Sequence, residues 1–384
     1  MIELERIDRK GVEQALESAS WTVIDTRDSN TFIGWRLNGE KKKGHIPGAT
    51  DFAAEWIRFP YKSPWEEKGE REHNIEQKLL DKKIPKDSRI ILYDTTEKDA
   101  PIVAEYLKDR GYKYFYYFNF SEWDGDTVWA EHYEEMVPVQ WVKAVMDGKN
   151  PEHFHGGRFK IFEVSETDEP CEDFINGHIP GSVHISVNEF QQEPEWCTVS
   201  DEKLRQFACD NGITKDTTVI LYAMGYTGAS HILATVLRYM GVEYVHCING
   251  TSNHWLYMGY EIETGNHPKE PVEDFGAVTP GRKEEIVKID EVKEFLLEKE
   301  EMQLIDMRSW EQYIGATSGY PHVKKAGRIP QTLWCAKEHW YLNPDETMGN
   351  PEEIGKKLNK VHRQKLDWKL LILIFILIGF GIIN

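Results

Sequence analysis

The residues best placed to do chemistry lie in a short loop between an expected strand and an expected helix. The loop Ala-Met-Gly-Tyr-Thr-Gly-Ala-Ser at 223–230 follows the apolar run 218–222 and leads into a helix expected over 231–239. Gly225 and Gly228 keep this loop compact. Backbone N–H groups that converge beside a helix N-terminus bind anions. The spacing by itself predicts an anion-binding loop and nothing more.

A similar loop follows an earlier apolar run at 89–93, and its first residue is Asp94. Glu97 and Asp99 add negative charge where an anion should bind. Like charges in one site repel each other, so anion binding here is disfavoured. We expect this loop to have a structural role, followed by a helix over 101–110 that begins at a proline and ends at a glycine.

These loops belong to a larger repeat. Gly-His-Ile-Pro-Gly occurs at 44–48 and 177–181, and a weaker Gly-Arg-Ile-Pro copy begins at Gly327. The copies are roughly 130 to 150 residues apart, which is the spacing of domains. Each motif predicts a turn, because proline fixes φ and glycine permits a positive φ. The chain is therefore expected to contain three copies of one domain.

A short apolar run that ends on an acid precedes each turn and predicts a buried strand. The runs lie at 22–27, 160–164 and 303–308. In the first and third, an arginine stands two residues after the acid, and we expect Arg27 and Arg308 to pair with nearby acids at the strand ends. His45 and His178 of the turns are expected to be hydrogen-bonded structural residues. Strands alternating with helices predict parallel sheets covered on both faces.

The Asp-x-Arg after a strand, followed by a phenylalanine and Gly-His-Ile-Pro-Gly, resembles the rhodanese family of sulfurtransferases. The resemblance covers nearly the whole chain, and the region around 313–330 looks like the last domain of three-repeat members. It implies tandem rhodanese-like α/β domains over 1–132, 133–275 and 276–369, with the third incomplete, and a hydrophobic tail over 370–384.

The resemblance also implies that the chemistry belongs to a cysteine in the loop after the central strand. Such a cysteine takes sulfur from thiosulfate or 3-mercaptopyruvate, holds it as a persulfide, and passes it to cyanide or a thiol. Asp94 and Ala223 stand at that position in the first two repeats. In the third, matching Asp367 to Asp216 places Ile374 there, followed by apolar residues without the loop's glycines. We therefore expect no catalytic cysteine and an impaired sulfurtransferase.

No other cysteine has the required setting. The five cysteines are scattered without metal-binding spacing, which fits free thiols in a reducing compartment: Cys171, Cys197, Cys209, Cys247 and Cys335. Weak substrate-binding candidates are Gly225, Gly228, Arg308 and Arg328, the arginines because a guanidinium can bind an anionic donor. No metal and no cofactor is expected. The alternative function is a non-catalytic anion-binding or scaffold protein.

The tail from Leu370 to Ile383 leaves three interpretations open. It is shorter than the roughly 20 residues that span a bilayer, but it could form a short or tilted anchor helped by Lys369. It could instead be a buried strand that overruns. The reading frame could also have been lost after about Lys360, since the family pattern fits up to Glu353 and then fails.

Bulk properties restrict the partners. The formal charge of −19 argues against nucleic acid, whose phosphates require clusters of lysine and arginine. The N-terminus lacks the basic start and apolar core of a signal peptide. We expect a cytoplasmic protein, with membrane association through the tail as the alternative, and a small sulfur-containing anion as the ligand.

Overall fold

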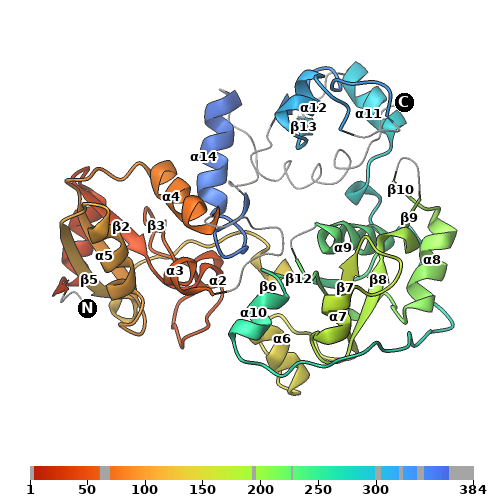
Figure 1. Ribbon diagram of the computed structural model, residues 1–384, viewed down its shortest axis with the longest axis horizontal. Coiled ribbons are helices and arrows are strands. Elements are labelled where there is room, and N and C mark those ends of the chain that lie inside the picture. Colours follow the sequence, from red (N-terminus) through yellow and green to blue (C-terminus); the bar gives the residue numbers. More distant parts are fainter. Residues whose placement is uncertain are drawn as a thin grey trace. The chain divides into compact units, whose positions relative to one another are not determined.

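A computed structural model describes residues 4–60, 70–192, 196–225, 228–298, 304–319, 323–334 and 341–362 (Figure 1). The chain divides into two compact units. Residues 1–143 and 339–351 form the first unit, and residues 144–338 and 352–384 form the second. The expected boundaries of the three repeats remain predictions, and each unit is described by itself below.

The first unit is built on a parallel five-stranded sheet with the order β1-β5-β4-β2-β3. Its strands are β1 (Glu5–Arg6), β2 (Trp21–Asp25), β3 (Thr50–Asp51), β4 (Arg89–Asp94) and β5 (Tyr114–Asn119). The strands expected within 22–27 and over 89–93 are confirmed. The central strand β4 is buried from Ile90 onward, as parallel strands covered on both faces usually are.

Helices cover both faces of this sheet. The side chains of β4 alternate between the two faces and therefore belong to two different core clusters. Ile91 and Tyr93 pack in one core cluster with Val12 and Ala15 of α1 (Arg9–Leu16). Ile90 and Leu92 pack in the other cluster with residues of three helices. Those helices are α3 (Ala54–Arg58), α4 (Glu70–Lys82) and α5 (Ala100–Asp109). A short helix, α2 (Ser29–Ile33), follows β2.

A segment distant in sequence completes the first unit. Asn343 donates from Nδ2 to Ser29 Oγ at 3.3 Å. Asn350 donates to Asp51 Oδ1 at 2.7 Å, and Lys82 Nζ donates to the same oxygen at 2.8 Å. These residues are buried or nearly so, which means that residues 341–350 are an integral part of this unit.

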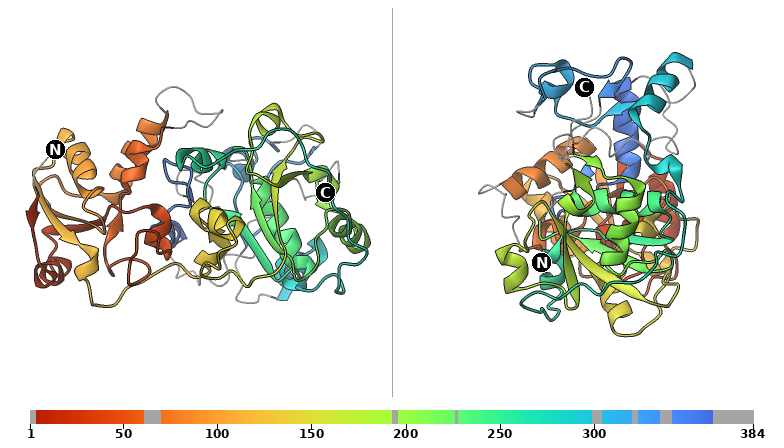
Figure 2. Two further views of the ribbon diagram at one scale, coloured as in Figure 1. Left: turned by 90° about the horizontal axis from the view of Figure 1, so that it is seen from below. Right: turned by 90° about the vertical axis from the view of Figure 1, so that its right-hand side faces the viewer.

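The second unit repeats the plan. Its strands β7 (Phe159–Ser165), β8 (Ser182–Ser186), β11 (Thr218–Tyr222) and β12 (Tyr244–Ile248) pair in parallel in the order β12-β11-β7-β8. The green part of the ribbon in Figure 2 contains strands of this sheet and the helices beside them. The strands expected from the apolar runs at 160–164 and 218–222 are confirmed. The helices of this unit are α7 (Glu172–Asn176), α8 (Asp201–Asp210), α9 (Ala229–Met240) and α10 (Ser252–Tyr257), and α6 (Val139–Met146) contains the boundary between the two units. The strands β9 (Gln191–Gln192) and β10 (Cys197–Thr198) pair in an antiparallel manner, and β6 (Met136–Val137) precedes α6.

The last part of the chain contributes a smaller set of elements. In the described residues, β13 (Ile305–Asp306) and β14 (Leu333–Trp334) form a two-stranded parallel sheet. The helices are α11 (Ile289–Glu298), α12 (Trp310–Ile314) and α14 (Pro351–His362). The strand expected within 303–308 is confirmed. Asp367, Ile374 and the hydrophobic tail lie outside the described residues.

Candidate functional site

The loop after β4 is occupied by the side chain of its own first residue. Asp94 is fully buried, and its carboxylate accepts hydrogen bonds from three backbone N–H groups. Glu97 N lies 2.6 Å from Oδ1, and Asp99 N and Ala100 N lie 2.8 and 2.9 Å from Oδ2. Tyr117 OH donates to Oδ1 at 3.0 Å. The N–H groups that could hold an external anion at the start of α5 are therefore already used.

The charges around this loop oppose the binding of a second anion. Asp99 pairs with Arg58 at 2.5 Å, and Arg58 also pairs with Glu55 at 2.6 Å. Burial raises the pKa of Asp99 to about 6 against the opposing effect of Arg58, and the charge of Asp94 raises it further. One arginine is thus shared between two acids beside a buried carboxylate, which supports the expected structural role.

The loop after β11 has no ionisable side chain at its start. Ala223 is buried, and Ser252 at the start of α10 donates from Oγ to Met224 O at 3.0 Å. Gly228 has φ of +76° and stands at the N-cap of α9, a backbone conformation that favours glycine. Burial lowers the pKa of His231 to about 4, so its ring is neutral near pH 7 and attracts no anion. Residues 226–227 lie outside the described part of the loop.

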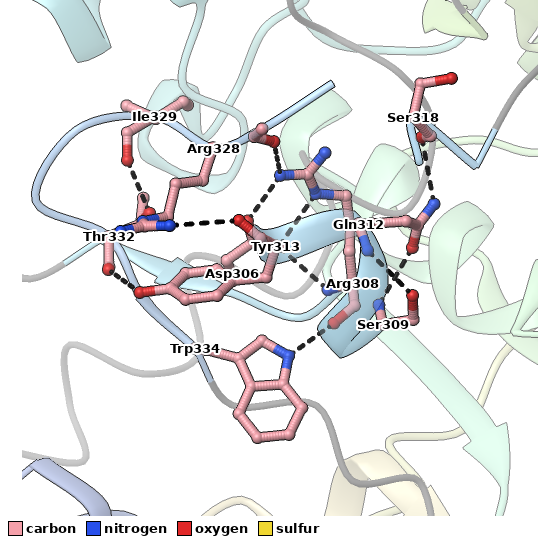
Figure 3. Close-up of polar contacts among 11 residues, drawn as sticks. Asp306, Arg308, Ser309, Gln312, Tyr313, Ser318, Arg328, Ile329, Thr332 and Trp334 are labelled. Carbon is pink, nitrogen blue, oxygen red and sulfur yellow. Dashed lines mark hydrogen bonds and ion pairs between the residues drawn. The ribbon is translucent and has the colours of Figure 1, made fainter. Parts of the chain in front are cut away.

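The two Asp-x-Arg motifs form the same structure, as expected. Arg27 donates from Nε and Nη2 to the two carboxylate oxygens of Asp25 at 2.9 and 2.6 Å, and from Nη2 to Gly44 O at 2.8 Å. Arg308 makes the corresponding bonds to Asp306 at 3.0 and 2.7 Å and to Gly327 O at 2.7 Å (Figure 3). Each arginine therefore ties the end of a strand to the turn that follows it.

The second repeat has no arginine at this position and uses another pair. Glu163 of β7 accepts a hydrogen bond from His184 Nδ1 of β8 at 2.7 Å. Burial alone would lower the pKa of His184, but the hydrogen bond and charge of Glu163 raise it overall. Asp25, Glu163 and Asp306 are thus each paired with a basic side chain.

The two arginines named as substrate-binding candidates differ in how much of the guanidinium a ligand can reach from solvent. The Arg308 side chain is only 11% exposed and its charge is balanced by Asp306. Arg328 is exposed, donates from Nη1 to Tyr313 O at 3.3 Å, and holds its guanidinium 4.4 Å from the centre of the Tyr313 ring. Of the two, Arg328 has the geometry to meet a ligand from solvent.

An aromatic cluster that the sequence analysis missed surrounds this site. Trp310, Tyr313 and Trp334 have ring centres 5.0 to 6.5 Å apart, and Trp310 is 48% exposed. Tyr313 OH donates to Thr332 O and Trp334 Nε1 donates to Arg308 O, both at 2.9 Å (Figure 3). The spacing of Trp310 and Tyr313, three residues apart in one helix, could have indicated this cluster.

The turn histidines have the structural role that was expected. His45 donates from Nδ1 to Phe32 O at 2.9 Å, and His178 donates from Nδ1 to Phe174 O at 2.8 Å. Each imidazole stacks on the same phenylalanine whose carbonyl it binds. Gly48 and Gly181 have positive φ, which confirms the predicted turns.

The described cysteines form no disulfide. Cys247 is buried in β12, and Cys171, Cys197 and Cys209 are partly exposed. Burial raises the pKa of Cys209, with nearby acids adding to the effect, so the thiolate is disfavoured. Cys335 lies outside the described residues. Within the described ranges, no helix has the length and apolarity needed to cross a membrane.

Comparison with known proteins agrees with this architecture. The rhodanese-like domain family matches residues 8–125 and 139–257. Thiosulfate sulfurtransferase YnjE of Escherichia coli is 28% identical over 350 residues, covering 88% of this chain and 76% of the relative. Sulfur carrier protein TtuD of Thermus thermophilus is 28% identical over 234 residues, covering 58% of this chain and 76% of the relative.

Solved structures extend the likeness over the whole fold. Wild-type EanB is 29% identical with a TM-score of 0.83, covering 94% of this chain and 86% of that one. The anaerobic ergothioneine biosynthesis enzyme of Chlorobium limicola, in complex with its natural substrate trimethyl histidine, is 28% identical with a TM-score of 0.82 and covers 94% and 87%. With two family matches over more than half of its length, this chain belongs to the rhodanese-like sulfurtransferase family.

Proposed function

We propose that this chain is a rhodanese-family sulfurtransferase by descent in which the first two domains hold no sulfur, and that the chain is impaired in transfer from thiosulfate or 3-mercaptopyruvate. The observation that carries the proposal is the buried carboxylate of Asp94, which takes the N–H groups that a persulfide would need. Ala223 in the second loop offers no nucleophile. Ile374, aligned with the third loop, has none either.

The chemistry explains why the missing thiol matters. A thiolate attacks the outer sulfur of thiosulfate, a sulfur–sulfur bond forms on the protein, and sulfite leaves with the electron pair. Cyanide then attacks the outer sulfur of the persulfide, thiocyanate leaves, and the thiolate returns. A carboxylate, a methyl group and an alkyl side chain cannot take the first step.

The test is sulfur loading and turnover. After treatment with thiosulfate, the intact mass of the purified chain should not increase by one sulfur atom. Thiocyanate release from thiosulfate and cyanide should not exceed that of a variant in which all five cysteines are serine. A persulfide on any cysteine together with turnover above that variant would refute the proposal.

A second candidate function is the binding of a small quaternary ammonium compound of the trimethyl histidine kind. Trimethyl histidine is bound by the similar enzyme of Chlorobium limicola. In this chain, the cluster of Trp310, Tyr313 and Trp334 presents aromatic faces, which attract cations through their quadrupoles. The position of Arg328 over Tyr313 supports the view that one of these faces accepts a positive charge.

Calorimetric titration with trimethyl histidine tests this candidate. We expect binding, and we expect Trp310→Ala to weaken it about tenfold, since one cation–π contact contributes up to about 2 kcal/mol. Trp129→Ala is the matched control, because Trp129 is similarly exposed at 46% and belongs to the first unit. Thiosulfate in place of trimethyl histidine tests the anion-binding alternative. If Trp310→Ala and Trp129→Ala weakened trimethyl histidine binding equally, the aromatic cluster would not be the binding site.

A further inference from the structure

Three metal-ligating side chains converge at the turn of the second repeat, away from the loops discussed above. They are His178 of the turn and Glu263 and His267 of the segment after α10. One ligand atom from each side chain lies within 4.8 Å of the others. All three residues belong to the second unit, and the sequence analysis did not anticipate their association.

His178 supplies the strongest observation. The residue is 1% exposed, and its Nε2 has no hydrogen-bond partner. Its Nδ1 carries the proton because it donates to Phe174 O, which leaves the lone pair on Nε2. Buried acceptors are normally satisfied. Metal-binding histidines usually have this arrangement, in which one ring nitrogen donates to a carbonyl and the other binds the ion.

The other two side chains are held next to this nitrogen. His178 and Glu263 exchange backbone hydrogen bonds of 2.9 and 3.0 Å, which fixes the two residues opposite each other. Gly181 N donates to Glu263 Oε2 at 2.7 Å, and His267 Nε2 lies 2.9 Å from the same oxygen. The site is thus pre-arranged by the backbone.

The first repeat provides an internal comparison. His45 forms the same pair of backbone bonds, at 2.9 and 3.0 Å, with Val128. Valine there occupies the place of Glu263, although His132 follows four residues later as His267 does. The backbone arrangement of the domain therefore does not itself require the three ligands, and of these two repeats the second combines them.

We infer that His178, Glu263 and His267 form a binding site for a divalent transition metal ion of the zinc class. Two imidazoles and one carboxylate are a ligand set that Zn²⁺ prefers, and three protein ligands leave a fourth position for water. Glu263 and His267 are about one-third exposed, with side-chain exposures of 38% and 36%, so an ion can reach the site from solvent. The inference is independent of the proposed sulfur chemistry.

The test uses the full chain without an affinity tag, freed of metal by a chelator and titrated calorimetrically with ZnCl₂. We expect one equivalent to bind, and His267→Ala to weaken that binding at least tenfold. Glu263→Val, which introduces the residue of the first repeat, should have a similar effect. His132→Ala is the matched control and should leave zinc affinity unchanged.

Two further measurements distinguish the loss of a metal ligand from the loss of the folded structure. Glu263→Gln keeps an oxygen for Gly181 N but removes the charge, so it should retain the melting temperature of the metal-free protein and still lose zinc affinity. Co²⁺ in place of Zn²⁺ should give the visible absorption of a four-coordinate site in the wild-type chain. This absorption should be absent in His267→Ala. Absence of zinc binding, or equal affinity in His267→Ala and the wild-type chain, would overturn the inference.

Discussion

Asp94→Ala is expected to destabilise the first unit by about 3 to 5 kcal/mol, because two buried N–H groups, one partly buried N–H group and the Tyr117 hydroxyl lose their acceptor at once. A single unsatisfied buried donor costs about 1 to 3 kcal/mol, and the losses here are not fully additive. The effect should be largest at the start of α5, where Asp99 N and Ala100 N are bound.

The measurement is hydrogen exchange together with urea unfolding. The amides of residues 97–100 should exchange faster in Asp94→Ala than in the wild-type chain, and the urea midpoint of the first unit should fall. Asp94→Asn keeps one acceptor oxygen and should lose about half as much stability. Asp87→Ala is the matched control, since Asp87 is exposed. Equal protection in Asp94→Ala and Asp87→Ala would show that the carboxylate does not hold this loop.

Asp94 also shows which features of the first loop can be predicted from sequence and which cannot. Its residue type sufficed to predict that the first loop carries no sulfur. The role of Tyr117 was hidden, because it depends on the parallel pairing of β4 with β5, where Leu92 is opposite Tyr117. Periodicity identifies a strand, but it does not say which strands pair or which side chains then meet.

The segments that the sequence analysis placed well are those with a local signal. Apolar runs located the central strands, and proline and glycine located the ends of α5 and α9. The attachment of residues 339–351 to the first unit has no such signal. It depends on buried amide groups such as Asn343 and Asn350, whose partners Ser29 and Asp51 are about 300 residues away. Long-range polar contacts of this kind have no periodicity.

Arg27→Ala should destabilise the first unit by about 3 to 5 kcal/mol, since it leaves the carboxylate of Asp25 buried without a counter-charge. Both side chains are fully buried, with the Arg27 guanidinium 3.8 Å from the centre of the Phe120 ring. The residue also links β2 to the turn through Gly44 O. Its loss therefore removes charge balance, ring packing and a backbone contact together.

Arg308 offers the matched comparison, because it makes the same bonds in a less buried setting, with an 11% exposed side chain. Water can reach the carboxylate of Asp306 when Arg308 is removed, so Arg308→Ala should cost only about 1 to 2 kcal/mol. Urea unfolding of both variants, followed by hydrogen exchange in each unit, separates the two effects.

A double variant isolates the charge. Asp25→Asn combined with Arg27→Met removes both charges and keeps similar volumes, so it should recover part of the stability lost in Arg27→Ala. If the double variant were as unstable as Arg27→Ala, the contact with Gly44 O and the stacking on Phe120 would account for the loss in place of the unpaired carboxylate. If Arg27→Ala and Arg308→Ala lost equal stability, burial would not be what makes the first pair strong. These variants thus separate two roles of Arg27: the hydrogen bond to Gly44 O that joins β2 to the turn, and the neutralisation of the Asp25 charge.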